Sequence, residues 1–483
     1  MGVADFVANE IAKKLNFKPT TCQATLFSEL GAFLMAPADE SWLFLISGYA
    51  GTGKTTAISA FIKQLQENKN NFVLIAPTGR SAKVLANYTG MSAKTIHKQI
   101  YRQKSLKDEY AQFSLDINKH KNTIFIVDEA SLITTGGGYS SAYGSSNSTG
   151  GNSIFGSGDL LDDLIMYVKS NEGNKLILMG DPAQLPPIGL EKSPALDEYY
   201  LQQYTKVTSV FLTTVVRQER ESGILFNATK LRQEIESNNL CNPQFEVEEF
   251  EDFRRIGGGE LIEEIGDAFD KFTPDEVVIL CRSNNRANRY NMGIRERVLY
   301  REEQLTRGDK VMVVKNCYQF LEEVKELDFI ANGDVAQLES INKYEERYGL
   351  HFASATLSFP DYNNIEIDAK IILDTLTSVT PSLDQQQQRE LFLQVYEDYE
   401  HIHLKKKRLA AVREDIYYNA LQIKYAAAIT GHKSQGGQWR CVFVDNSLWN
   451  ENITLDDKKW LYTAITRGVE RVYLVNFNDK YFL

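Results

Sequence analysis

The sequence predicts an α/β protein built on two doubly wound sheets of buried parallel strands. Two series of short apolar runs lead to this prediction, the first at 42–47, 72–76, 123–127 and 175–179, the second at 277–280, 311–314, 442–444 and 472–475. The runs alternate with segments of helical periodicity, and those of the first series end in Gly, Pro or Asp clusters, as buried parallel strands do. A chain of 483 residues has room for about two to four domains.

Three segments interrupt this regular pattern. Residues 98–121 are polar with isolated aromatics, and we expect a small insertion there. Residues 134–158 are rich in Gly and Ser, which predicts a flexible surface loop. Residues 336–420 contain a possible strand pair, a glutamine run at 385–388 and a basic run at 405–408. The expected domains are therefore 1–200, a second domain made of 201–335 and 421–483, and an inserted subdomain at 336–420.

The bulk composition narrows the class of protein. No segment approaches the roughly 20 apolar residues that cross a bilayer. The five cysteines are scattered without a CxxC pair, which argues against a disulfide framework or a zinc site and favours a reducing compartment. We expect a cytoplasmic monomer with no membrane partner. The net charge of −11 argues against binding nucleic acid by overall charge, although a strand-tracking enzyme can confine its basic groups to a channel.

A complete phosphate-binding motif follows the first apolar run. It fits GxxxxGK[ST] and consists of Gly48, Tyr49, Ala50, Gly51, Thr52, Gly53, Lys54 and Thr55. Because it lies between a strand and a helical pattern, backbone N–H groups and a helix N-terminus can surround phosphates. Lys54 would reach the β- and γ-phosphates of ATP, Thr55 would bind Mg²⁺, and Thr56 completes the expected nucleotide contacts.

An acidic pair, Asp128 and Glu129, follows the third apolar run of the first domain. An Asp at a strand end can hold Mg²⁺, and an adjacent Glu can orient the attacking water. Downstream of a phosphate-binding loop in the same domain, the pair predicts ATP hydrolysis.

Six further stretches occur in a fixed order along the chain: 76–83 (APTGRSAK), 95–97 (TIH), 180–187 (GDPAQLPP), 216–218 (VRQ), 430–436 (TGHKSQG) and 461–467 (LYTAITR). Together with the phosphate motifs they resemble the RecD-like and Dda-like helicases of superfamily 1B. The resemblance covers residues 20 to 475.

The resemblance implies two RecA-like P-loop domains in tandem, with a small pin insertion in the first and an SH3-like β insertion in the second. It implies a DNA helicase or translocase that moves 5′→3′ on single-stranded DNA, unwinds duplex at single-strand/double-strand junctions and consumes Mg-ATP. An RNA helicase or remodeller of superfamily 1 remains an alternative, because a preference for 2′-OH is not visible in these motifs. A nucleotide-gated binding module without catalysis is the third reading, although Lys54, Glu129 and Arg467 are all present.

By the same resemblance, individual residues receive roles. Gln184 would sense the γ-phosphate, Arg217 and Arg467 would bring positive charge to it, and Arg467 would be the arginine finger. Gln23 would read the adenine edge, and Gly436 is assigned to the nucleotide side. The residues expected to contact the strand are Pro77, Thr78, His97, Thr430, His432 and Lys433.

Other side chains have two open interpretations. Tyr101, Tyr110 and Phe113 are the aromatics of the pin-like insertion, and we favour Phe113 or Tyr110 as the residue that stacks on a base, against packing on the protein body. Arg80 and Lys83 either add positive charge for the strand or lie on a solvated helix face. The basic run at 405–408 has the same two interpretations.

Overall fold

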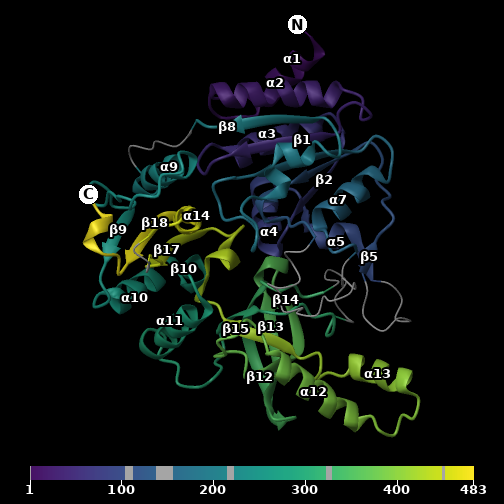
Figure 1. Cartoon of the computed structure of the whole chain (residues 1–483), viewed down its shortest axis with the longest axis vertical. Coiled ribbons are helices and arrows are strands. Elements are labelled where there is room, and N and C mark those ends of the chain that lie inside the picture. Colours follow the sequence, from purple (N-terminus) through teal and green to yellow (C-terminus); the bar gives the residue numbers. More distant parts are fainter. Residues whose placement is uncertain (1, 104–112, 137–155, 215–221, 322–328, 449–451) are drawn as a thin grey trace.

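The computed structural model describes residues 2–103, 113–136, 156–214, 222–321, 329–448 and 452–483. Two parallel sheets and a closed barrel organise these residues (Figure 1). We call the part built on the six-stranded sheet the first domain and the part built on the five-stranded sheet the second domain. The predicted fold class, two RecA-like α/β domains with a β insertion, is confirmed.

The first domain carries a six-stranded parallel sheet in the order β3-β2-β6-β7-β1-β8. Its strands are β1 Leu43–Gly48, β2 Asn71–Ala76, β3 Ala93–Thr95, β6 Thr123–Val127, β7 Lys175–Gly180 and β8 Val207–Leu212. Its helices are α1 Val3–Lys13, α2 Thr21–Met35, α3 Lys54–Glu67, α4 Gly79–Thr89, α5 Ile96–Ile100, α7 Leu160–Lys169 and α8 Glu198–Leu201.

Both faces of this sheet are covered, as the unbroken apolar runs predict. Along β1, Leu43 and Leu45 face a core shared with α7, whereas Phe44 and Ile46 face a core shared with α2 and α3. Alternate side chains of a strand point to opposite faces, so a strand buried on both sides must be apolar throughout.

The second domain carries a five-stranded parallel sheet in the order β16-β10-β17-β18-β9. Its strands are β9 Phe253–Ile256, β10 Val277–Cys281, β16 Ala428–Thr430, β17 Trp439–Asp445 and β18 Gly468–Val475, and its helices are α9 Gly223–Glu236, α10 Leu261–Phe272, α11 Asn284–Arg297 and α14 Leu455–Ile465. Its main core also takes in Tyr49, Ala183 and Leu185 from the first domain, so the two domains pack against each other through apolar contacts.

A closed five-stranded barrel interrupts the second domain (Figure 1). Its strands are β11 Lys310–Val313, β12 Val335–Arg347, β13 Leu350–Phe359, β14 Ile365–Ile372 and β15 Leu421–Tyr425. The run at 311–314 was expected in the second parallel sheet, and that expectation is wrong. It pairs antiparallel with β12 and β15 instead, so the barrel reaches beyond the predicted insertion at 336–420 on both sides.

Two helices connect β14 to β15 (Figure 1). The glutamine run forms the first turn of α12 Gln385–Asp398, where Asp384 and Gln387 make a capping box. The basic run begins α13 Lys405–Glu414, and its three lysines are exposed. Arg408 lies over the Tyr396 ring at 3.8 Å, so the fourth basic residue joins the two helices rather than facing solvent alone.

The insertion in the first domain forms a short antiparallel pair, β4 Tyr101–Gln103 with β5 Phe113–Leu115. Tyr101 does not serve as a free stacking aromatic, because it is buried and its hydroxyl donates to Asp163 at 2.6 Å. Tyr110, the Phe113 side chain and most of the Gly/Ser segment lie outside the described residues, so the pin prediction and the loop prediction stay predictions.

Among the helices that the structure describes, none is long and apolar enough to cross a membrane.

Candidate nucleotide-binding and strand-binding site

The phosphate-binding loop lies between β1 and α3. Gly51 and Gly53 have φ of 77° and 76°, which favours glycine at both positions. A Cβ at Gly48 would lie 2.9 Å from the Leu212 Cβ, so β8 leaves no room for a side chain there. Lys54 Nζ donates to the carbonyls of Gly48 and Tyr49 at 2.6 and 2.9 Å. The lysine therefore curls back over the loop, where phosphate oxygens can replace these carbonyls.

Gln23 is wholly buried and is occupied by protein partners. Its amide oxygen accepts from Thr20 N at 3.1 Å, as part of the capping box of α2, and its Nε2 donates to the Thr52 carbonyl at 3.3 Å. Gln23 thus joins a helix start to the phosphate-binding loop. A contact with adenine would compete with both bonds, so in this conformation its observed contribution is to position the loop.

Asp128 and Glu129 lie directly after β6. Burial, and next the negative charge of Glu129, raise the pKa of Asp128 to about 7, while the Lys54 ammonium opposes that rise. Glu129 has a left-handed φ of 52°, and its N–H donates to Asp128 Oδ1 at 2.8 Å. A buried carboxylate that resists ionisation has much to gain from a bound cation, and oxygen donors of this kind suit Mg²⁺. Thr55, half-buried at the start of α3, supplies a second oxygen donor of the same kind.

The segment after β7 faces the second domain. Asp181 is buried, and its Oδ1 accepts from Ala183 N at 2.9 Å. Leu185 N donates to Thr463 Oγ1 at 2.9 Å, and the Leu185 carbonyl accepts from Gln435 Nε2 at 2.7 Å. The segment is therefore bonded through its backbone to two motifs of the second domain.

Gln184, in the same segment, is only 6% exposed. Its Oε1 has no hydrogen-bond partner within the described part of the chain. A buried amide oxygen without a partner carries a desolvation cost that a ligand or an ordered water can relieve.

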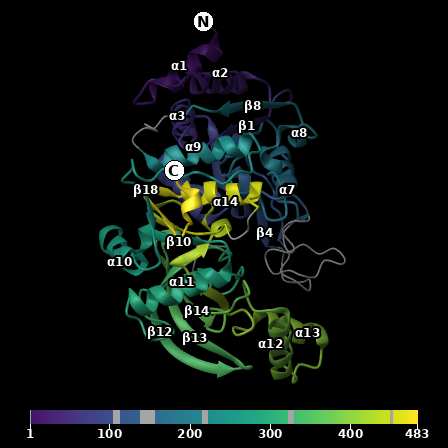
Figure 2. The same ribbon diagram turned by 60° about the vertical axis from the view of Figure 1, so that its left-hand side comes forward.

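Helix α14 presents the opposite side of this interface, beside α9 (Figure 2). Arg467, two residues after α14 ends, is 4% exposed and lies with Nη1 3.9 Å from Glu129 Oε1. Its guanidinium also donates to the carbonyls of Thr463 and Gly437 at 3.1 and 3.2 Å, which orients it. The predicted arginine finger and the predicted water-orienting carboxylate thus meet across the domain boundary. Arg217 lies outside the described residues.

Thr78 is the N-cap of α4, just after β2. Its Oγ1 accepts from Ser81 N at 3.1 Å, and Ser81 Oγ in turn accepts from Thr78 N at 3.1 Å. Gly436, which was predicted to contact the nucleotide, packs here: with φ of 73°, a Cβ on it would lie 2.8 Å from the Ser81 Cβ and 3.3 Å from Thr78 Oγ1. Gly436 therefore joins the two predicted strand motifs, one from each domain. Pro77, between β2 and Thr78, is half-buried.

His97 lies in α5, near the Tyr101 ring at 5.7 Å and the Phe329 ring at 6.4 Å. Burial lowers the pKa of His97 to about 4. The imidazole is therefore neutral at physiological pH, and it could contact a strand by hydrogen bonding or packing but not as a cation.

Thr430, His432 and Lys433 follow one another where β16 ends and a 3₁₀ turn begins. Thr430 and Lys433 line a small pocket together with Asn284, Lys424 and apolar residues. Burial lowers the pKa of both Lys424 and Lys433 to about 8, and it also lowers the pKa of His432. Buried ammonium groups of this kind are stabilised by a nearby anion such as a backbone phosphate.

Arg80 and Lys83, on α4, make contacts between parts of the chain. The Arg80 guanidinium lies 3.8 Å from the centroid of the Trp439 ring on β17. Lys83 Nζ donates to the Pro360 carbonyl at 2.5 Å and lies 3.6 Å from Asp361 in the β13–β14 turn. These two charges therefore hold α4 against the second domain and the barrel, an alternative that residue type alone did not suggest.

Four residues of the nucleotide site have no role in the sequence prediction. They are Tyr462, Thr463 and Gln435, which bond to the first domain, and Arg232, whose guanidinium lies 4.5 Å from the centroid of the Tyr49 ring. A signal for one of them was available, because Thr463 lies four residues before Arg467, about one helical turn.

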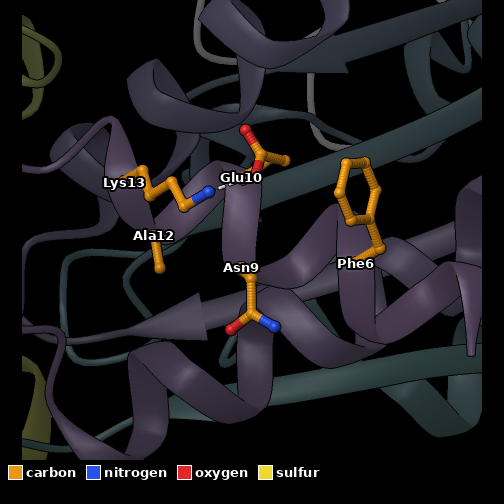
Figure 3. A pocket seen from close by; sticks show the side chains of 5 residues that line it. All are labelled: Phe6, Asn9, Glu10, Ala12 and Lys13. Atoms are coloured by element: carbon orange, nitrogen blue, oxygen red, sulfur yellow. Dashed lines mark hydrogen bonds and ion pairs between the residues drawn. The ribbon is translucent and has the colours of Figure 1, made fainter. Parts of the chain in front are cut away.

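A surface hollow of about 480 Å³ lies elsewhere, on α1 (Figure 3). It is lined by Phe6, Asn9, Glu10, Ala12 and Lys13, and Lys13 pairs with Glu10 at 2.6 Å. All five residues come from one helix, and no group of converging donors faces the hollow. None of the residues predicted to bind phosphate lines this hollow.

Two protein families match this chain at the sites described. The AAA domain matches residues 32–137, which contain the phosphate-binding loop and the acidic pair. The UvrD-like helicase C-terminal domain matches residues 425–475, which contain Thr430 and Arg467.

Among curated relatives, an uncharacterised protein of Acanthamoeba polyphaga mimivirus is 23% identical over 505 aligned positions, covering 89% of this chain and 94% of the relative. An uncharacterised protein of Methanocaldococcus jannaschii is also 23% identical, over 473 positions, and this match covers 89% of the chain but 36% of that relative.

Among solved structures, the Pif1 helicase from Bacteroides in complex with ADP-AlF3 and single-stranded DNA has a TM-score of 0.49 at 15% identity, covering 97% of this chain and 95% of that one. The Pif1 helicase from Candida albicans has a TM-score of 0.44 at 15% identity, with coverage of 96% and 95%. The two family matches support the predicted relationship to superfamily 1B helicases, since they fall on the two α/β domains in the expected order.

Proposed function

We propose that this superfamily 1 helicase hydrolyses Mg-ATP to move 5′→3′ along single-stranded DNA and to unwind duplex ahead of it. The observation that carries the proposal is the split of charge across one interface. Lys54 comes from the first domain, whereas Arg467 comes from the second and lies 3.9 Å from Glu129. When the groups that stabilise the transferring phosphoryl come from two different domains, ATP hydrolysis depends on closure of the cleft between those domains.

The residues present fit the nucleotide and its metal. The amides of the loop and of the α3 N-terminus would surround the phosphates, and Thr55 and Asp128 would hold Mg²⁺, which supplies positive charge to the phosphate oxygens. Glu129 would accept a proton from the attacking water. Gln184, with its amide oxygen buried and unpartnered in the described chain, would accept a hydrogen bond from that water.

The strand would cross from one domain to the other. Thr78 lies two residues beyond the carboxyl end of β2, and Thr430 ends β16, so each sheet offers a hydroxyl at the end of a strand. Binding in open α/β sheets occurs at the carboxyl ends of strands. Because Gly436 packs against Thr78, a change in the domain interface would shift the two hydroxyls relative to each other.

The polarity and the preference for DNA rest on the superfamily 1B motifs. An acidic chain that binds a strand through a few hydroxyls, buried lysines and neutral imidazoles would do so with little sequence preference. The RNA alternative differs only in contacts with the 2′-OH.

Two tailed duplexes test the proposal. With ATP and Mg²⁺, the protein is expected to open a DNA duplex with a 5′ single-stranded tail and to leave its 3′-tailed counterpart closed, whereas Lys54→Ala opens neither. Opening of the 3′-tailed duplex alone would overturn the polarity. If the protein opens a 5′-tailed RNA duplex faster than the 5′-tailed DNA duplex, the RNA alternative is favoured.

A further inference from the structure

The Tyr462 side chain connects the two domains at the phosphate-binding loop. Its hydroxyl accepts a hydrogen bond from Ala50 N at 2.8 Å and donates one to Asp181 Oδ2 at 2.7 Å. Ala50 belongs to the loop after β1, Asp181 to the segment after β7, and Tyr462 to α14 of the second domain. One hydroxyl therefore bonds two nucleotide-side segments of the first domain to a helix of the second.

Both bonds are shielded from water. Tyr462 and Asp181 are each 1% exposed. Burial, and next the carboxylate of Asp181, raise the pKa of Tyr462 well above its ordinary value, so the hydroxyl keeps its proton and can serve both partners. Hydrogen bonds to a charged group in a dry site are stronger and more directional than exposed ones.

A short path leads from Tyr462 to the arginine finger. The Tyr462 carbonyl accepts from Thr466 Oγ1 at 2.8 Å, and Arg467 Nη2 donates to the same Thr466 Oγ1 at 3.3 Å. Thr463, beside Tyr462, accepts two hydrogen bonds. Its carbonyl accepts one from Arg467 Nε, and its hydroxyl accepts one from Leu185 N. The guanidinium is thus held by the turn of α14 that Tyr462 attaches to the first domain.

We propose that the Tyr462 hydroxyl is a positioning group that sets the place of Arg467 relative to the phosphate-binding loop. This inference rests on the proposed function, because it assigns Tyr462 to the same ATP hydrolysis. Without the hydroxyl, α14 remains packed in its core but loses its bond to Ala50 and Asp181, so Arg467 samples positions away from the transferring phosphoryl. Tyr462 does not touch that group itself.

The test compares Tyr462→Phe with a matched control, Tyr481→Phe. Tyr481 is equally buried in the second domain, and its hydroxyl has no partner within the described residues. In steady-state ATP hydrolysis with single-stranded DNA, Tyr462→Phe is expected to lower kcat by about tenfold, the scale of a buried hydrogen bond to a charged group, with KM for ATP within about twofold. Tyr481→Phe is expected to match the wild type, and both variants to keep its circular dichroism spectrum.

A double substitution separates positioning from general weakening of the interface. On an Arg467→Ala background, Tyr462→Phe is expected to cost less than about twofold, because the group that it positions is absent. A full tenfold loss on that background, or an unchanged kcat in the single variant, would overturn the proposal. If the wild type itself hydrolyses no ATP in the presence of single-stranded DNA, the proposed function fails instead.

Discussion

The junction between α4 and the barrel contains a buried carboxyl group whose ionisation should weaken the fold. Asp334 is 4% exposed; it accepts from Ala331 N at 2.7 Å and from the Tyr362 hydroxyl at 3.0 Å. Burial raises the pKa of Asp334 from 3.8 to about 7, against the opposing effect of these two hydrogen bonds. The perturbation we choose is Asp334→Asn, which stays neutral at every pH and can still bond to both partners.

The magnitude follows from the two pKa values. Because the folded-state pKa is the higher one, the neutral carboxyl is favoured in the folded chain, and stability is lost as pH rises through about 7. At ~1.36 kcal/mol per pKa unit, the loss approaches about 4 kcal/mol in alkaline solution. The part that falls between pH 6 and 8 is about 1.4 kcal/mol, since the folded carboxyl loses its proton in the middle of that window while the unfolded one is ionised throughout.

The assay is urea unfolding of both proteins at pH 6 and pH 8, followed by circular dichroism. Asp334→Asn is expected to be the more stable protein at pH 8, with a free-energy advantage about 1.4 kcal/mol larger than at pH 6. Asp361→Asn, in the neighbouring turn, controls for removal of a negative charge from the same junction. An advantage that is the same at both pH values would refute the reasoning, because it would show that Asp334 does not titrate within the folded chain in this window.

Three further outcomes are expected. Lys54→Ala should abolish ATP turnover, measured as phosphate release, because it removes a charge from the transferring phosphoryl group; hydrolysis near the wild-type rate would contradict the loop assignment. Gln184→Ala should leave nucleotide affinity nearly intact, measured by equilibrium binding of a fluorescent ATP analogue, but reduce the stimulation of hydrolysis by single-stranded DNA. Arg80→Ala should lower the thermal midpoint, because it removes about 1–2 kcal/mol from the free energy of unfolding. Arg80→Lys should recover only part of this loss, since a flat guanidinium stacks on Trp439 better than an ammonium does. Equal midpoints for Arg80→Ala and the wild type would show that the stack adds nothing.

The chemistry of the nucleotide site could be predicted from sequence because it is local. The loop from Gly48 to Thr55 needs glycines with positive φ, a strand before it and a helix after it, and all three are properties of consecutive residues. The same holds for Asp128, which directly follows an apolar strand. The two parallel sheets could also be predicted, since a strand buried on both faces must be apolar throughout.

Contacts between residues far apart in sequence could be predicted less well. The run at 311–314 is as apolar as the other strands. Four apolar residues do not specify whether the neighbouring strands run parallel or antiparallel, and this segment became a strand of the barrel. The packing of Gly436 against Thr78 and Ser81 depends on how the two domains meet, and its motif alone did not predict it.

The sequence by itself therefore determined the fold class and pointed to a relationship with helicases and to candidate phosphate-binding residues, because each depends on local pattern. Only the tertiary structure decided which side chains complete the site. Tyr462 and Ala50 lie 412 positions apart, and their hydrogen bond exists because two domain cores pack together along α14. Such a contact depends on the relative placement of whole domains, which is set by the sum of many weak apolar contacts and by no single segment of the chain.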